Sequence, residues 1–204
     1  MMAAHASTLV IAASTLATST VFAIDVQRAD TRYHNGRYEL EVEATLHAPA
    51  PEVQRVLRDY VLYPKLDSRV LDAKVLERPK EHEALLYSQL RVCIAAILCR
   101  RVNRVERVEE RTNELLATAI PERSDVKFGL THMQLSTTAE STTRLVYRTQ
   151  IEPKFWVPRM LPKRAMLNTL RDATIQLLTQ VEKNAQHGTV HAEVPHLSPA
   201  VPVK

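Results

Sequence analysis

Residues 48–64 read APAPEVQRVLRDYVLYP, a proline-rich turn followed by a short segment with helical spacing. From Glu52 onward, apolar side chains recur at intervals of three and four residues, at Val53, Val56, Leu57 and Tyr60. This spacing predicts an amphipathic helix with Pro51 near its first turn, where proline is favoured. The Tyr63-Pro64 pair breaks the pattern, so the segment predicts a short helix that ends before residue 64.

Alternating apolar and polar residues on both sides of this segment predict a sheet. Residues 38–46 place Leu40, Val42, Ala44 and Leu46 on one face. Similar patterns lie at residues 70–77, 84–93, 99–109, 114–120, 128–138 and 143–152. The short links between these strands favour antiparallel pairing, and one-sided alternation means that one face of the sheet is covered.

Residues 162–184 supply the cover for that face. The segment contains no glycine and no proline after Pro162, and its apolar residues are spaced three to four apart. The spacing predicts a long helix whose apolar stripe lies against the sheet.

The order of these elements resembles the helix-grip arrangement of the START-like (SRPBCC) superfamily. Residues 48–64 are similar to the opening of its coenzyme Q-binding and polyketide cyclase branch, through Leu57, Asp59, Tyr60, Tyr63 and Pro64. The EPKFWVP stretch at residues 152–158 resembles bacterial members, and the resemblance covers residues 36–184.

The resemblance implies an α+β, helix-grip fold. A curved antiparallel sheet of about six to seven strands wraps around a long C-terminal helix, with two short helices after the first strand. It also implies an apolar cavity between sheet and helix that holds a lipid, quinone, sterol or polyketide-like molecule. The family's second hairpin often carries aromatic residues and an Arg-Asp step, whereas residues 93–101 here read CIAAILCRR.

The composition excludes several common function classes. The 204 residues carry a net charge of +4 and include only three glycines, at Gly36, Gly129 and Gly188. This spacing allows no P-loop, no dinucleotide-binding turn and no nucleophile elbow. The two cysteines form no zinc-finger pattern.

Residues 1–23 predict a secretory signal peptide. They contain no Asp, Glu, Lys or Arg and end in Val-Phe-Ala, which suits a signal peptidase. The alternative, a transmembrane anchor, is disfavoured because the segment is short and rich in Ser and Thr. We therefore expect a mature chain from Ile24, a periplasmic or secreted location, a START-like domain at 24–185 and a disordered tail at 186–204.

The two cysteines predict a disulfide at a hairpin tip. If residues 94–98 form that tip, Cys93 faces Cys99 across the ladder and can form a bridge in an oxidising compartment. The alternative is two buried free thiols. The same register pairs Leu90 with Val102 and Val92 with Arg100, and it places Arg104 and Glu106 on the face of Leu90. If that face is the concave one, these two form a polar handle inside the cavity, unless a bulge lies between Val102 and Val105.

Basic residues concentrate around this hairpin. Arg91, Arg100 and Arg101 flank the apolar segment 94–98, which could dip into lipid. In an exported protein this pattern favours contact with an anionic membrane surface and not with nucleic acid. The alternative is a solvated strand face.

The cavity wall follows from the predicted register. Pairing residues 143–152 with 128–138 puts Leu145 opposite Leu135 and Tyr147 opposite Met133. The predicted ligand-binding wall is Leu86, Leu90, Met133, Leu135, Leu145 and Tyr147 from the sheet, Met166, Leu170, Ala173 and Leu177 from the helix, and Trp156 at the mouth. The alternative is that these side chains meet as a filled core.

No catalytic constellation stands out in the sequence. The histidines are dispersed and predict no metal site, and we expect no cofactor. The leading hypothesis is periplasmic binding or transfer of a hydrophobic small molecule. The rival is a polyketide cyclase or aromatase that uses the same cavity with one side chain as acid or base. The sequence leaves the oligomeric state open.

Overall fold

The computed structural model describes residues 24–94, 98–155 and 163–191. The predicted signal peptide, residues 95–97 of the apolar hairpin segment, Trp156 and the end of the predicted tail lie outside this part of the chain.

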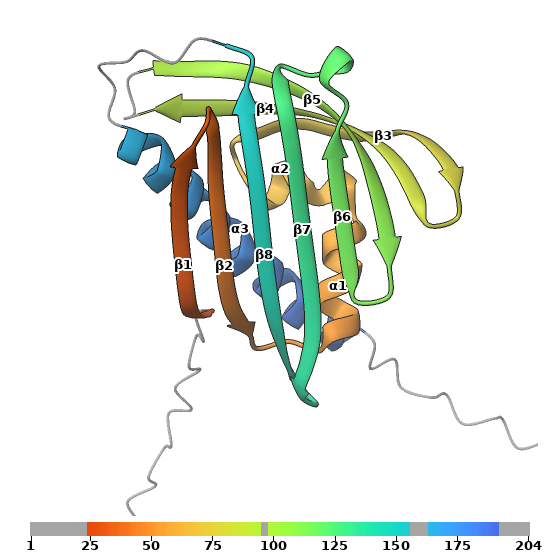
Figure 1. Ribbon diagram of the computed structural model, residues 1–204. Coiled ribbons are helices and arrows are strands. Elements are labelled where there is room, and N and C mark those ends of the chain that lie inside the picture. Colours follow the sequence, from red (N-terminus) through yellow and green to blue (C-terminus); the bar gives the residue numbers. More distant parts are fainter. Residues whose placement is uncertain (1–23, 95–97, 156–162, 192–204) are drawn as a thin grey trace, which may run out of the picture.

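The described residues form an α+β fold with one eight-stranded antiparallel sheet, in the order β1-β2-β8-β7-β6-β5-β4-β3. The strands are β1 (Asp25–His34), β2 (Arg37–Leu46), β3 (Val70–Lys80), β4 (Glu83–Ile94), β5 (Leu98–Arg111), β6 (Glu114–Ala119), β7 (Val126–Ala139) and β8 (Thr142–Pro153). The sheet curves strongly, so that β4 and β5 lie across the upper end of the other strands (Figure 1).

Helices cover one face of the sheet. They are α1 (Ala50–Arg58), the 3₁₀ turn η1 (Tyr60–Leu62), α2 (Tyr63–Leu66) and α3 (Lys163–His191). A second 3₁₀ turn, η2 (Pro121–Arg123), lies between β6 and β7 at the upper end of the sheet (Figure 1). Helix α3 crosses behind β1, β2 and β8, and α1 packs beside its C-terminal half (Figure 1). This is the predicted helix-grip arrangement, with two short helices between β2 and β3.

The strand count is higher than the predicted six to seven because β1 was not recognised from the sequence. Its register shifts between Val26 and Arg28, which interrupts the period of two. As an edge strand it is also exposed or half-buried along its whole length. Both features weaken the alternation on which a strand prediction depends.

Helix α3 also extends further than the predicted 162–184, to His191. Ala185 is fully buried, and the side chain of Gln186 donates to the carbonyl of His47 at 2.8 Å. Gly188 lies directly against the side chains of Glu52 and Arg55 on α1. These tertiary contacts support helix in a segment whose composition alone suggests a tail.

The predicted registers are confirmed. Leu90 pairs with Val102 and Val92 with Arg100, without a bulge between Val102 and Val105. Cys93 and Cys99 are directly opposite and form a disulfide, with Cα atoms 3.9 Å apart. On the other side of the sheet, Leu135 pairs with Leu145 and Met133 with Tyr147.

The core lies between the concave face of the sheet and the helices. Leu40, Val42, Ala44 and Leu46 of β2 alternate inward and are at most 2% exposed. They meet Val53, Val56 and Leu57 of α1 and Leu178, Val181 and Ala185 of α3. Glu182 of α3 is also buried, and it accepts the backbone N–H of His47 at 2.7 Å.

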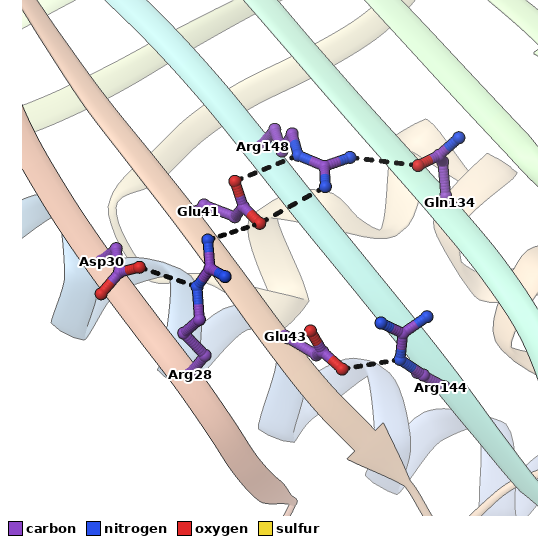
Figure 2. A network of polar contacts seen from close by, with 7 residues as sticks. All are labelled: Arg28, Asp30, Glu41, Glu43, Gln134, Arg144 and Arg148. Carbon is purple, nitrogen blue, oxygen red and sulfur yellow. Dashed lines mark hydrogen bonds and ion pairs between the residues drawn. The ribbon is translucent and has the colours of Figure 1, made fainter.

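The opposite, convex face carries a network of ion pairs (Figure 2). Arg28 contacts Asp30 and Glu41, and Arg148 contacts Glu41 from the other side. Arg144 pairs with Glu43 at 2.7 Å. Each arginine in this network therefore has an acidic partner, so the network as a whole carries no net positive charge.

Candidate functional site

A cavity of about 290 Å³ lies between the concave face of the sheet and α3. Its wall is mainly aliphatic and aromatic, and its residues come from β2, the η1–α2 segment, β4 to β8 and the N-terminal half of α3. It exists because α3 bridges the curved sheet while α1 fills only the lower end of the concave face (Figure 1).

Most of the predicted wall residues line this cavity. From the sheet these are Leu86, Leu90, Met133 and Tyr147, and from α3 they are Met166, Leu170, Ala173 and Leu177. The predicted polar handle, Arg104 and Glu106, lines it as well.

Two predicted wall residues do not line the cavity. Leu135 and Leu145 point inward but are packed in the core, at 6% and 0% exposure. They lie further along β7 and β8, at the end of the sheet where α1 contacts both strands. The prediction failed there because α1, and not empty space, covers that end.

The sequence did not identify the contribution of the η1–α2 segment. Tyr60 and Tyr63 line the cavity, as do Asp67 and Arg69 just beyond α2. The signal was the DYVLYP pattern, which places two tyrosines three residues apart. That pattern was interpreted as evidence for the fold only.

A small polar site lies in the cavity wall. Arg104 Nη2 is 2.9 Å from Glu106 Oε2, and their side chains are 20% and 4% exposed. Ser88 stands opposite Arg104 on the β4–β5 ladder. Within the described residues, Arg104 Nε and Ser88 Oγ are buried without a hydrogen-bond partner. The site therefore keeps unused hydrogen-bonding capacity next to a neutralised ion pair.

The tyrosines around this site are poor proton acceptors at neutral pH. Burial raises the pKa of the Tyr63 hydroxyl, which donates to the Leu57 carbonyl at 2.7 Å. Burial likewise raises the pKa of Tyr147, against the effects of Arg104 and of hydrogen bonds with Thr131 and Thr149. Each hydroxyl thus stays protonated and acts as a hydrogen-bonding group.

Tyr60, which lines the cavity, is held in place by a buried hydrogen bond. Its hydroxyl donates to Glu110 Oε1 at 2.7 Å, and Arg78 Nη1 lies 3.1 Å from the same oxygen. Burial, followed by the hydrogen bond to Glu110, raises the pKa of Tyr60. The contact ties η1 to β5, which holds the lining tyrosine in place.

A second polar contact joins the α2–β3 loop to α3. Asp67 and Arg69 form a two-point ion pair at 2.7 and 2.8 Å. Arg69 Nη2 also donates to the carbonyl of Ala173 at 2.8 Å. The contact joins the loop to the middle of α3, where Ala173 lines the cavity.

The described lining contains no histidine, lysine or free thiol. In the same part of the chain, no three His, Cys, Asp or Glu side chains are grouped so that they could hold a metal ion. Among the described helices, none is long and apolar enough to cross a membrane. The arrangement favours binding of an apolar molecule with one polar group.

Comparisons with known proteins place this fold. No protein-family model matches the chain, and no curated protein sequence matches it. Solved structures do. The Zhui aromatase/cyclase from a Streptomyces species superposes with a TM-score of 0.61 at 16% identity, over 77% of this chain and 98% of that one.

Two further structures agree. A START superfamily protein from Mycobacterium smegmatis gives a TM-score of 0.59 at 14% identity, over 73% of this chain and 97% of that one. Human STARD10 gives 0.54 at 16% identity, over 84% and 79%. The fold is therefore START-like, as the sequence resemblance implied.

Proposed function

We propose that this chain, whose fold is START-like, binds a hydrophobic small molecule between its sheet and α3 and transfers it in the periplasm. The observation that carries the proposal is the cavity, since a wall that is mostly apolar with a few polar groups is typical of small-molecule sites. START-like folds serve hydrophobic ligand binding or cyclase chemistry.

The size of the cavity restricts the ligand. A volume of about 290 Å³ is at the lower end of the range for small-molecule pockets. It suits one ring system or one acyl chain better than the two chains of a phospholipid. A lipid with one chain, a quinone or a sterol-like molecule is therefore our proposed ligand class.

The polar site restricts the ligand further. Arg104 lines the cavity and its Nε is buried without a hydrogen-bond partner, so an oxygen atom of the ligand could accept a hydrogen bond from it. Glu106 neutralises the arginine, so the partner need not be charged. A hydroxyl or carbonyl group on an apolar body meets these conditions.

The proposed location rests on the sequence and the disulfide. The charge-free segment 1–23 suggests export, and the Cys93–Cys99 bridge suits an oxidising compartment. In that compartment Arg91, Arg100 and Arg101 would contact an anionic membrane surface, from which the ligand is taken up or to which it is delivered.

A cyclase or aromatase activity is the second candidate. The structural likeness to the Zhui aromatase/cyclase favours it, and Glu106 and Arg104 are polar groups in the cavity. However, the raised pKa values of Tyr63 and Tyr147 remove two potential bases. Binding needs no such group, so we rank it first.

The test is ligand retention and thermal stabilisation. Native mass spectrometry with organic extraction should find a co-purifying lipid-like molecule. Thermal unfolding with a panel of lipids, sterols and quinones should then identify its class. A ligand at about 100 times its dissociation constant should raise the melting temperature by roughly 5 to 11 °C.

A matched pair of variants connects this shift to the cavity. Leu170→Trp places an indole in the cavity and should abolish the shift without lowering the ligand-free melting temperature. Leu76→Trp makes the same change at an exposed position of β3 and should retain the shift. If no compound shifts the midpoint, and Leu170→Trp destabilises as in an overpacked core, the binding proposal is wrong.

A further inference from the structure

Two cation–aromatic pairs lie at the end of the cavity where β8 ends and α3 begins, which is called the mouth below. At the start of α3, Lys163 Nζ lies 4.1 Å from the ring centroid of Tyr33. Just beyond the end of β8, the ring of Phe155 lies 5.2 Å from the Arg100 guanidinium, measured to its centroid. Phe155 lines the cavity, and Tyr33 packs against Tyr38, which also lines it. Both pairs are therefore directly connected to the wall of the mouth.

The positive charge at this end is not neutralised. Within the described residues, no acidic side chain forms an ion pair with Lys163, Arg100 or Arg101. The convex face differs, because the arginines drawn there are all paired with Asp or Glu (Figure 2). Lys163, Arg100 and Arg101 therefore lack the acidic partners that the network in Figure 2 provides.

The β4–β5 hairpin extends this charged region. Arg101 is directly opposite Arg91, and Arg100 is opposite Val92. The ends of β4 and β5 at this hairpin lie above the start of α3 (Figure 1). Cationic residues of β4, β5 and α3 thus lie at the same end of the molecule, although β5 and α3 are far apart in the sequence.

We propose that this end of the molecule, which carries the Lys163–Tyr33 and Arg100–Phe155 pairs, docks onto an anionic lipid bilayer. The inference rests on the proposed function and adds the docking surface and its orientation, with the cavity mouth facing the lipid. Lysine and arginine next to an anionic leaflet are attracted to its headgroups, and aromatic rings favour the interface between headgroups and acyl chains. A ligand can then pass between bilayer and cavity without crossing water.

Vesicle flotation tests the docking surface. The triple variant Arg100→Gln, Arg101→Gln and Lys163→Gln removes three charges at the mouth. The matched control, Arg28→Gln, Arg144→Gln and Arg148→Gln, removes three charges from the convex face (Figure 2). Both variants have the same net charge, and their melting temperatures verify that they fold.

The wild-type protein should float with vesicles of phosphatidylcholine and phosphatidylglycerol in equal parts, and not with phosphatidylcholine alone. The mouth variant should bind the anionic vesicles on the order of a hundredfold more weakly, since each charge contributes roughly fivefold. The control should change much less, and added salt should weaken the wild type. Equal loss in both variants, or no vesicle binding by the wild type, would overturn the proposal.

Binding of a soluble fluorescent fatty-acid analogue, measured without vesicles, separates the two proposals. The mouth variant should keep this binding because none of its three positions lines the cavity. If the wild type binds the analogue but no vesicles, the docking proposal fails and ligand binding stands. If it binds vesicles through the mouth but no ligand of the panel, ligand binding fails and docking stands.

Discussion

Replacing Glu106 with leucine leaves the Arg104 guanidinium in the cavity wall without its counter-charge. The two side chains are 4% and 20% exposed, so water can replace little of the lost interaction. Removing one partner of a buried ion pair costs about 3 to 5 kcal/mol, and the partial exposure of Arg104 suggests the lower end. A loss of about 3 kcal/mol should lower the melting temperature by roughly 6 to 12 °C in a chain of this length.

The double variant Arg104→Met with Glu106→Leu separates pairing from packing. It removes both charges and keeps apolar side chains in the wall, so its stability should return to within about 1 kcal/mol of the wild type. The matched control is Arg144→Met with Glu43→Leu, since these residues form an ion pair on the exposed convex face. There each single change should lower the melting temperature much less than Glu106→Leu does, because water screens the exposed pair.

Thermal and urea unfolding followed by circular dichroism measure these differences, and melts with ligand add a functional readout. The double variant should still be stabilised by a purely apolar ligand and should lose any preference for one with a hydroxyl or carbonyl group. If Glu106→Leu unfolds at the wild-type temperature, or if the double variant is no more stable than the single ones, the pair does not act as a buried ion pair.

Three other predictions concern stability. Gly129→Ala places a methyl group 2.8 Å from the Cβ of Ala119 and should cost about 1 to 3 kcal/mol in urea unfolding, which Ala119→Gly should partly restore; an additive double variant would contradict this. Burial raises the pKa of Glu182 above its ordinary 4.5, so its contribution to stability is lost as pH rises through the raised value. Glu182→Gln should therefore gain stability relative to wild type from acid to neutral pH, and the opposite trend in melting temperature would refute it. Replacing Cys93 and Cys99 by alanine should cost roughly 2 kcal/mol, and two alkylatable thiols in the native, non-reduced protein would contradict the bridge.

The sequence predicted those parts of the fold in which local periodicity and pairing agree. Residues 143–152 alternate cleanly, and apolar matching with residues 128–138 gives the register that pairs Leu145 with Leu135. The cysteine spacing likewise fixed the register of the β4–β5 hairpin. Strand β1 was not predicted, because a bulge in an exposed edge strand interrupts the alternation of apolar and polar residues.

The cavity wall was predicted less completely, because a cavity forms only where no helix or side chain fills the space beside the sheet. Leu145 and Tyr147 lie on the same face of β8, so the alternation of apolar and polar residues along the strand does not distinguish them. Only the position of α1 makes the first a core residue and leaves the second beside open space. Arg69 reaches the wall through its contacts with Asp67 and with α3, a segment more than half the chain away. Contacts between residues so far apart in the sequence cannot be predicted from local sequence patterns.

The strand order also has a consequence for how the chain folds. Every neighbouring pair of strands is consecutive in the sequence except β2 and β8, which join residues 38–46 to residues 143–151. Hairpins close small loops and form early, whereas this pairing closes a loop of half the chain and carries the largest entropic cost. We expect β3 to β8 to assemble first as a meander and the β1–β2 hairpin to dock last. The concave face would stay open until that step, so the final barrier to folding is also the step at which the binding site comes into existence.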